Sequence, residues 1–191
     1  PKQLLPIQGS SLIRHLAKIS IASVCDPIVV VLGAYIHQIR PEIEDLPLQI
    51  VDNPQWQAGM GTSVSTGLAA LLARELGLNA VLILVGDQPF ISTSLIDRLV
   101  MAYRSQRHQI VASGYLDMVG VPALFSDRYF AELLNLNSDA GARRIIQQHL
   151  SETYTVDFPQ GAIDLDTPDE YRAFLDLSGA DLGYNFPCEI I

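Results

Sequence analysis

One apolar run constrains the fold of this chain more than any other feature. Residues 81–85 read Val-Leu-Ile-Leu-Val and end abruptly in Gly86-Asp87-Gln88-Pro89. An unbroken run rich in Val and Ile is typical of a strand that is buried on both faces, as in a parallel sheet. In open α/β sheets ligands bind beyond the carboxyl ends of the strands, which is where Asp87 lies. Asp87 therefore either holds a divalent metal on a nucleotide phosphate, with Gly86 allowing close approach, or serves only a strand-to-helix turn.

Apolar runs alternate with helical periodicity along the chain, which is the pattern of a parallel sheet covered by helices. The expected strands are residues 28–32, 48–51, 80–85, 109–112, 121–125 and 153–156. The expected helices are residues 11–21, one from Val64 that ends before Gly77, one through Ile96 and Tyr103, 138–150 and 168–175. We expect Thr62 or Ser63 to cap the second of these helices and Ser92 or Thr93 to cap the third. Thr167 to Glu170 form a capping box with Pro at the first helical position.

Composition bounds the class of protein. The 191 residues fit one domain, which we place at residues 1–177, followed by an irregular tail at 178–191. A net charge of −9 counts against a sequence-independent grip on nucleic acid. No apolar run approaches the roughly 20 residues of a membrane span, and no secretory signal is visible. The two cysteines, Cys25 and Cys188, have no partner spacing, which favours free thiols in a reducing cytoplasm.

The start of the chain is unusual for a doubly wound sheet. Such a sheet normally begins with its central strand, followed by a loop that cradles phosphates. Here Pro1, Lys2 and Gln3 are followed almost directly by the expected helix at residues 11–21. We therefore expect either a different fold, or that roughly 20 residues, about one strand and its loop, are absent from this sequence.

Several short segments occur together in a characteristic order. They are Pro1-Lys2, Asn53-Pro54-x-Trp56-x-x-Gly59-Met60-Gly61-x-Ser63, Gly86-Asp87-Gln88-Pro89, Gly120-Val121-Pro122, Asp139-x-Gly141-Ala142-Arg143 and Asp164-x-Asp166-Thr167-Pro168-Asp169-Glu170-Tyr171. In this order and spacing the chain resembles the molybdenum cofactor cytidylyltransferases, from Pro1 to about Leu175. Pro1 and Lys2 match the last two residues of that family's glycine-rich opening. The resemblance implies a three-layer α/β/α, Rossmann-like fold of the nucleotide-diphosphosugar transferase type, with a mostly parallel sheet.

The resemblance also implies an activity. It is the Mg²⁺-dependent transfer of CMP from CTP to the terminal phosphate of molybdopterin, with release of pyrophosphate. The product is the dinucleotide cofactor of molybdenum hydroxylases, so a hydroxylase or its maturation chaperone is the expected protein partner. The chain is taken as a cytoplasmic monomer.

Catalysis of this kind needs neutralised charge and aligned groups rather than a covalent catalyst. By the resemblance, Asp87 and Asp164 hold Mg²⁺ against the CTP phosphates, because this ion takes one or two protein carboxylates. Lys2 contacts phosphates, or is a solvated lysine at the chain end. Asp166 either reaches the metal or lies before the Thr167 cap, where the helix dipole favours it.

The remaining expected contacts divide between nucleotide and acceptor. The nucleotide side comprises Gly59, Met60, Gly61, Ser63 and Gly86, with Ser63 alternatively a helix cap. The acceptor side comprises Gln88, Pro89, Gly120, Pro122 and Arg143. Arg143 either clamps the acceptor phosphate in a bidentate way or pairs with Asp139. Trp56 either lines the pterin pocket or packs in its loop.

Three alternatives stay open from the sequence. The chain could be a GTP-using molybdopterin guanylyltransferase, because base choice depends on few contacts. It could transfer a nucleotide to another small phosphorylated acceptor. It could also be a non-catalytic relative that binds a nucleotide or a partner, although two carboxylates at strand ends favour an enzyme.

Overall fold

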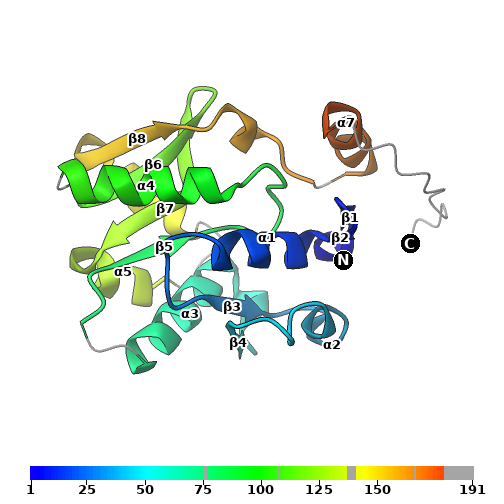
Figure 1. The fold of residues 1–191 in the computed structure, drawn as a ribbon. Coiled ribbons are helices and arrows are strands. Elements are labelled where there is room, and N and C mark those ends of the chain that lie inside the picture. Colours follow the sequence, from blue (N-terminus) through cyan, green and yellow to red (C-terminus); the bar gives the residue numbers. More distant parts are fainter. Residues whose placement is uncertain (75–76, 107, 137–140, 166, 179–191) are drawn as a thin grey trace.

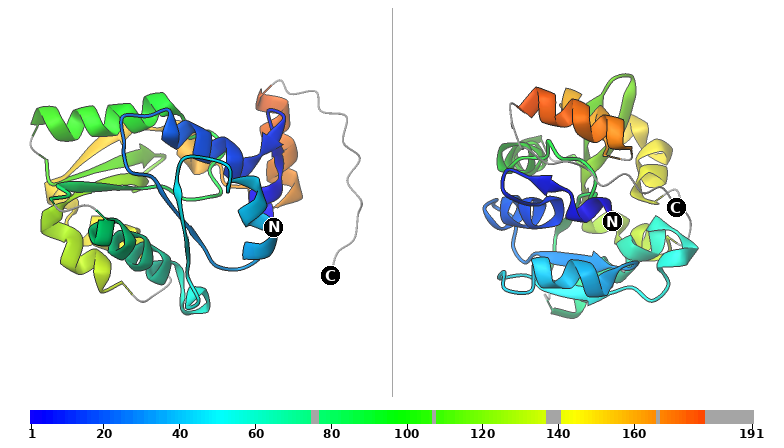
Figure 2. Two further views of the ribbon diagram at one scale, coloured as in Figure 1. Left: turned by 60° about the horizontal axis from the view of Figure 1, so that its bottom comes forward. Right: turned by 90° about the vertical axis from the view of Figure 1, so that its right-hand side faces the viewer.

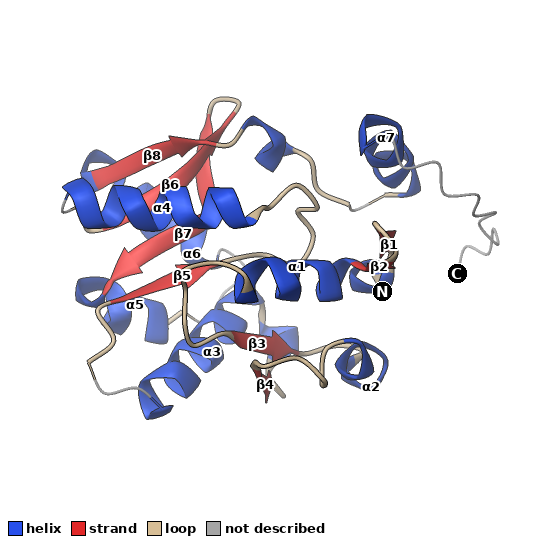
Figure 3. Cartoon of the chain, viewed as in Figure 1, coloured by secondary structure: helices blue, strands red, loops and turns tan. Residues whose placement is uncertain are grey.

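The computed structural model describes residues 1–74, 77–106, 108–136, 141–165 and 167–178 (Figure 1). The strands are β1 (Pro6–Ile7), β2 (Ser10–Ser11), β3 (Val29–Leu32), β4 (Gln49–Asp52), β5 (Ala80–Ile83), β6 (Ile110–Tyr115), β7 (Met118–Ser126) and β8 (Thr153–Asp157). The helices are α1 (Leu12–Ile21), α2 (Ile36–Ile39), α3 (Met60–Arg74), α4 (Thr93–Gln106), α5 (Phe130–Leu134), α6 (Gly141–Gln148) and α7 (Pro168–Ser178). Every expected strand is present, and Figure 3 shows how strands and helices alternate.

The largest sheet has the strand order β5-β7-β6-β8. β7 is antiparallel to both of its neighbours, whereas β6 and β8 are parallel, so β5, β6 and β8 run the same way. β7 is reversed because the two residues between Tyr115 and Met118 close a hairpin, and a hairpin joins only antiparallel strands. β3 and β4 form a separate parallel pair, and β1 and β2 form a short antiparallel hairpin.

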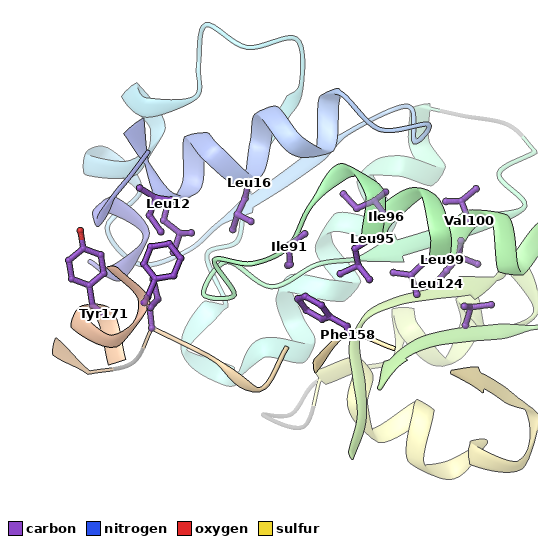
Figure 4. Packing of buried hydrophobic residues seen from close by; sticks show 14 residues of the cluster. Leu12, Leu16, Ile91, Leu95, Ile96, Leu99, Val100, Leu124, Phe158 and Tyr171 are labelled. Carbon is purple, nitrogen blue, oxygen red and sulfur yellow. The ribbon is translucent and has the colours of Figure 1, made fainter. Parts of the chain in front are cut away.

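Helices cover the sheet on both faces, and the alternation of side chains along β6 shows how. Val111 packs into a cluster with residues of α1, α4 and α7, whereas Ile110 and Ala112 pack into a second cluster with residues of α3, α5 and α6. Successive strand residues point to opposite faces, so both faces of β6 are apolar. Figure 4 shows the first cluster, in which Leu99 of α4 lies close to Leu124 of β7. The three-layer prediction is confirmed.

β5 is less buried than the sequence predicted. Its side chains contact both clusters, with Leu82 on one face and Val81 and Ile83 on the other. All of its residues are nevertheless only half-buried. Within the described part of the chain β5 pairs with β7 alone, so one edge of the strand carries no ladder partner. The expectation of full burial on both faces was therefore wrong.

The structure confirms the expected helix starts near Ser11, at Ser92 and at Thr167. The start expected at Thr62 or Ser63 is wrong, and the one expected at residue 138 lies outside the described residues. Ser11 and Ser92 cap α1 and α4 with their hydroxyls, which accept from the backbone N–H groups of Arg14 and Leu95 at 3.4 and 3.2 Å. The Thr167 and Glu170 side chains bond each other's backbone N–H, as a capping box does. α3 begins at Met60, one turn earlier than predicted, so Thr62 and Ser63 lie inside it.

The first residues of the chain lie beside its last described helix (Figures 1 and 2). The Tyr171 hydroxyl of α7 donates to the Pro6 carbonyl at 2.7 Å. The β1–β2 hairpin and the short helices α2 and α5 were not predicted, because two to five residues are too few for a periodic signal. In the described residues no helix combines the length and the apolar character that crossing a membrane requires.

Candidate functional site

The site is centred on Asp87, in the loop that follows β5. A short 3-10 turn, η1 (Lys2–Leu4), brings Lys2 to this loop, and its Nζ lies 2.8 Å from Asp87 Oδ2. Gly86 lies against the same turn: a Cβ built there would meet only Gln3 Cγ, at 3.9 Å. Two residues that lie 85 positions apart in the sequence are therefore paired at the carboxyl end of β5, where ligands bind in open α/β sheets.

A backbone hydrogen bond of the neighbouring Leu165 brings the Asp164 segment to the Asp87 loop. The N–H of Leu165 donates to the carbonyl of Asp87 at 3.1 Å, which fixes the segment before α7 against the Asp87 loop. The described residues contain no cluster of three or more His, Cys, Asp or Glu side chains arranged for a metal. Two carboxylates that share a cation with phosphate and water are a donor set that Mg²⁺ or Mn²⁺ takes on a nucleotide, whereas a zinc site needs more protein ligands. Asp166 lies outside the described residues.

Asn53 organises the loop before α3, and the sequence suggested no role for it. Its buried amide donates to Thr62 Oγ1 at 2.8 Å and to Ser63 Oγ at 3.0 Å, and its Oδ1 accepts from the N–H of Gln55 at 2.9 Å. The chain reverses at Gly59, whose φ of 112° is a left-handed value that favours glycine. The first turn of α3 is thereby held in place.

Three of the nucleotide-side residues lie at this turn with different exposures. Met60 is 51% exposed, whereas Gly61 is buried and Ser63 is half-buried. The Met60 side chain lies over Gly141, the first residue of α6, with Sδ 3.2 Å from a Cβ built there. The loop therefore contacts the helix that carries Arg143.

Trp56, in the 3-10 turn η3 (Trp56–Ala58), packs on the backbone of Gly33 at the end of β3. A Cβ at Gly33 would lie 2.5 Å from Trp56 Cβ and 2.9 Å from Cγ, so only glycine fits there. The indole is still 44% exposed. It packs in its loop and keeps a surface for contact.

Gln88 is buried beside Asp87. Its Nε2 donates to the carbonyl of Gly161 at 2.8 Å, and that bond fixes which way the amide points. Its Oε1 is buried and has no hydrogen-bond partner among the described residues. Pro89 and Pro122 are buried as well, and the carbonyl of Pro122 accepts from Ser113 Oγ at 2.7 Å.

Tyr115, at the end of β6, is a site residue that the sequence analysis missed. Its ring lies over Gly161, where a Cβ would be 2.7 Å from Tyr115 Cδ1, and its hydroxyl fills the space over Gly120. Burial raises the pKa of this hydroxyl. Arg143 and a hydrogen bond with the Gln88 side chain oppose the rise, whereas Asp164 and Asp87 add to it. The Tyr115 side chain thus lies within electrostatic reach of the main charged residues expected at the site.

Arg143 projects from the first turn of α6. Its Nη2 lies 3.1 Å from the Sδ of Met118, at the start of β7, and the side chain is exposed. A thioether is a weak acceptor, so this contact positions the guanidinium without neutralising it. Asp139, the alternative partner, lies outside the described residues.

Similarity to known proteins identifies the family to which the chain belongs. The model of the MobA-like NTP transferase domain matches residues 1–153. The chain belongs to this family. Nicotine blue oxidoreductase of Paenarthrobacter nicotinovorans is 30% identical to the chain over 154 residues, covering 78% of this chain and 74% of that protein. The purine catabolism protein PucB of Bacillus subtilis (strain 168) is 27% identical over 183 residues, covering 89% and 85%.

Solved structures agree on the fold. The Rv0371c homolog from Mycobacterium sp. strain JC1 superposes with a TM-score of 0.75 at 26% identity, covering 93% of this chain and 87% of that one. A nucleotidyl transferase from Methanothermobacter gives 0.76 at 20% identity, covering 92% and 84%. Rv0371c of Mycobacterium tuberculosis H37Rv, in complex with manganese, gives 0.73 at 23% identity and covers 92% of each chain. The predicted nucleotidyltransferase fold is confirmed.

Proposed function

We propose that this MobA-like NTP transferase transfers CMP from CTP to the terminal phosphate of molybdopterin and releases pyrophosphate. The observation that carries the proposal is the meeting of Lys2, Asp87 and the Asp164 segment at the carboxyl end of β5. The acceptor phosphate is itself the nucleophile, so no protein base is required. The chain's part is to hold charge and to align the two substrates.

In this proposal Asp87 and Asp164 hold a divalent cation, Mg²⁺ or Mn²⁺, which neutralises the triphosphate when it is bound. Lys2 exchanges its contact with Asp87 for the phosphates. The related Rv0371c protein was solved in complex with manganese, which supports a divalent cation in this fold. Gly59, Met60, Gly61 and Ser63 receive the base and ribose, and Gly86 leaves room for the phosphates.

One relative is named an oxidoreductase, which is a different class of enzyme. Oxidation and reduction require an electron carrier, and the protein's part is then to bind and tune that carrier. The groups brought to Asp87 are instead the Lys2 cation and the chain segment that carries Asp164. These groups hold a metal and phosphates, and this chemistry favours nucleotidyl transfer.

The proposal places the reaction in the cytoplasm. Cys25, the cysteine within the described residues, is a free thiol, which suits a reducing compartment. The dinucleotide product would be passed to a molybdenum hydroxylase or to its maturation chaperone.

The first experiment is calorimetric titration of the chain with CTP, GTP, ATP and UTP, each with Mg²⁺ and with Mn²⁺. CTP selectivity that depends on the cation supports the proposal, and GTP selectivity would assign the chain to guanylyl transfer. Pyrophosphate release is then measured with molybdopterin and with other phosphomonoesters, which identifies the acceptor. Nucleotide binding without release of pyrophosphate would favour the non-catalytic alternative.

The matched variants are Asp87→Asn and Asp157→Asn. Asp157 ends β8 and exposes its side chain, so its loss should leave transfer unchanged. Asp87→Asn should reduce transfer by at least 100-fold, because the cation loses a charged ligand. Transfer that survives in Asp87→Asn would remove the metal assignment.

A further inference from the structure

Two donors of hydrogen bonds lie at the acceptor side of the site, on different elements. Arg143 comes from α6 and Tyr115 from the end of β6, where Tyr115 is the ladder partner of Met118 on β7. Met118, the first residue after the β6–β7 turn, contacts Arg143 through sulfur at 3.1 Å. The hairpin that carries Tyr115 therefore also positions the arginine.

The Tyr115 side chain occupies space that is open only because residues 120 and 161 are glycines. Its ring occupies the space beside Gly161, where Phe158 is the other neighbour, and its hydroxyl occupies the space over Gly120. A larger residue at either position would push the tyrosine out of place. The ring therefore has one place to lie, with its hydroxyl over Gly120.

The state of the hydroxyl follows from its surroundings. An ordinary tyrosine hydroxyl already keeps its proton at neutral pH, and burial raises the pKa of Tyr115 further. A protonated phenol donates one hydrogen bond. Beside an arginine whose described hydrogen bond is to a thioether, that donor suits an oxygen that carries negative charge.

We propose that Tyr115 and Arg143 form a subsite for the phosphate of the acceptor, in which the Tyr115 hydroxyl donates to one phosphate oxygen and the guanidinium to the others. The inference rests on the nucleotidyltransferase function proposed above and names a residue that selects the acceptor. It predicts a preference for acceptors that end in a phosphomonoester over those that end in a hydroxyl, because a hydroxyl offers no charge to the arginine.

The three methionines of the chain provide reporters for this subsite. Met118 contacts Arg143, Met60 lies on the nucleotide loop, and Met101 on α4 is 67% exposed and lies outside the site. In ¹³C-methyl methionine spectra, inorganic phosphate should shift the Met118 signal as it draws Arg143 from the sulfur. CTP with Mg²⁺ should shift the Met60 signal, and the Met101 signal should stay unchanged in both titrations.

The variants are Tyr115→Phe, Arg143→Gln and the control Tyr154→Phe. Tyr154 stacks on His108 at β8 and would lose its hydroxyl without losing its ring. Tyr115→Phe should weaken phosphate binding at the Met118 reporter by about tenfold or more, as expected for one hydrogen bond to a charged group. It should also raise the KM for the acceptor while leaving that for the nucleotide unchanged. Arg143→Gln should abolish the phosphate response.

The reporters separate the two proposals. A Met118 response to phosphate, with no nucleotide binding by any reporter or by calorimetry, would retain the subsite and overturn nucleotidyl transfer. Normal CTP binding with a Met118 signal that ignores phosphate would overturn the subsite alone. A Tyr115→Phe chain that binds phosphate like the Tyr154→Phe chain would overturn the role of the tyrosine. Circular-dichroism spectra that match the wild type show that each variant is folded.

Discussion

The Nζ of Lys2 lies 2.8 Å from Oδ2 of Asp87, so the second residue of the chain neutralises the carboxylate at the centre of the site. Both side chains remain partly exposed, at 33% for Lys2 and 22% for Asp87. An ion pair of this kind is weak enough to exchange partners. A cation and a triphosphate can therefore separate the pair, each taking one of its members.

Lys2→Met should make the free protein bind Mn²⁺ more tightly, because the lysine no longer competes for Asp87. An increase of about two- to fivefold is expected from the usual strength of a partly exposed ion pair. Calorimetric titration with Mn²⁺ in the absence of nucleotide measures it. The same variant should bind Mg²⁺–CTP less tightly, since the phosphates lose a cation. The control is Lys18→Met on the exposed face of α1, and equal Mn²⁺ affinity in Lys2→Met and wild type would contradict the exchange.

Asn53→Ala should loosen the loop that precedes α3. The substitution removes two donors and one acceptor that hold Gln55, Thr62 and Ser63. We expect a loss of about 1–3 kcal/mol in the free energy of unfolding, as for other buried hydrogen-bonded groups, and weaker nucleotide binding. Urea denaturation and CTP titration measure the two effects. Asn135→Ala, which removes an exposed amide at the end of α5, should change neither by a comparable amount.

Gly161→Ala and Gly86→Ala test the packing around Tyr115. A Cβ at Gly161 would lie 2.5 Å from Phe158 and 2.7 Å from Tyr115, so the variant should lose about 1–3 kcal/mol of stability by overpacking. A Cβ at Gly86 meets only Gln3 Cγ at 3.9 Å, an ordinary contact, so Gly86→Ala should unfold at the wild-type urea concentration. Similar losses in both variants would mean that backbone freedom, and not space, sets the need for glycine.

Much of the fold could be predicted because apolar periodicity reports burial directly. The strands at 110–115 and 153–157 and the capping box at Thr167 all follow from local pattern. The direction of β7 could not be predicted in this way, since it depends on the two-residue turn at Leu116 and not on the apolar run of the strand. The start of α3 was misplaced because Asn53, a residue outside the helix, engages the hydroxyls that were expected to cap it.

The candidate site was predictable to the extent that strand ends converge. Asp87 follows β5, and the segment of Asp164 joins it by a backbone bond, as parallel strands of one sheet allow. Tyr115 was not predictable, because a lone tyrosine at a strand end resembles any half-buried aromatic. The position of its side chain depends on Gly120 and Gly161, which lie 5 and 46 residues further along the chain. Two isolated glycines give no periodic signal in a sequence.

A last prediction concerns pH and the attachment of α1. Arg14 of α1 donates to Oδ1 and Oδ2 of Asp45 at 2.6 and 2.7 Å and to the carbonyl of Glu42 at 2.6 Å, which ties the helix to the segment before β4. The hydrogen bonds from Arg14 lower the pKa of Asp45 from 3.8 to about 2. A carboxyl whose pKa is depressed by folding stabilises the native state above its unfolded pKa and loses that contribution as the pH falls through the folded value.

Asp45→Asn should therefore lower the Tm at pH 7, and the difference from wild type should persist down to about pH 4. Below that pH the difference should shrink, and it should vanish near pH 2 as Asp45 becomes protonated in the folded protein. Thermal unfolding at low salt measures it, because both charges are solvent-accessible and salt screens them. In an Arg14→Met background Asp45→Asn should have no such pH-dependent effect. A difference in Tm that stayed constant from pH 7 to pH 2 would show that the Asp45 carboxylate does not stabilise the fold through its charge.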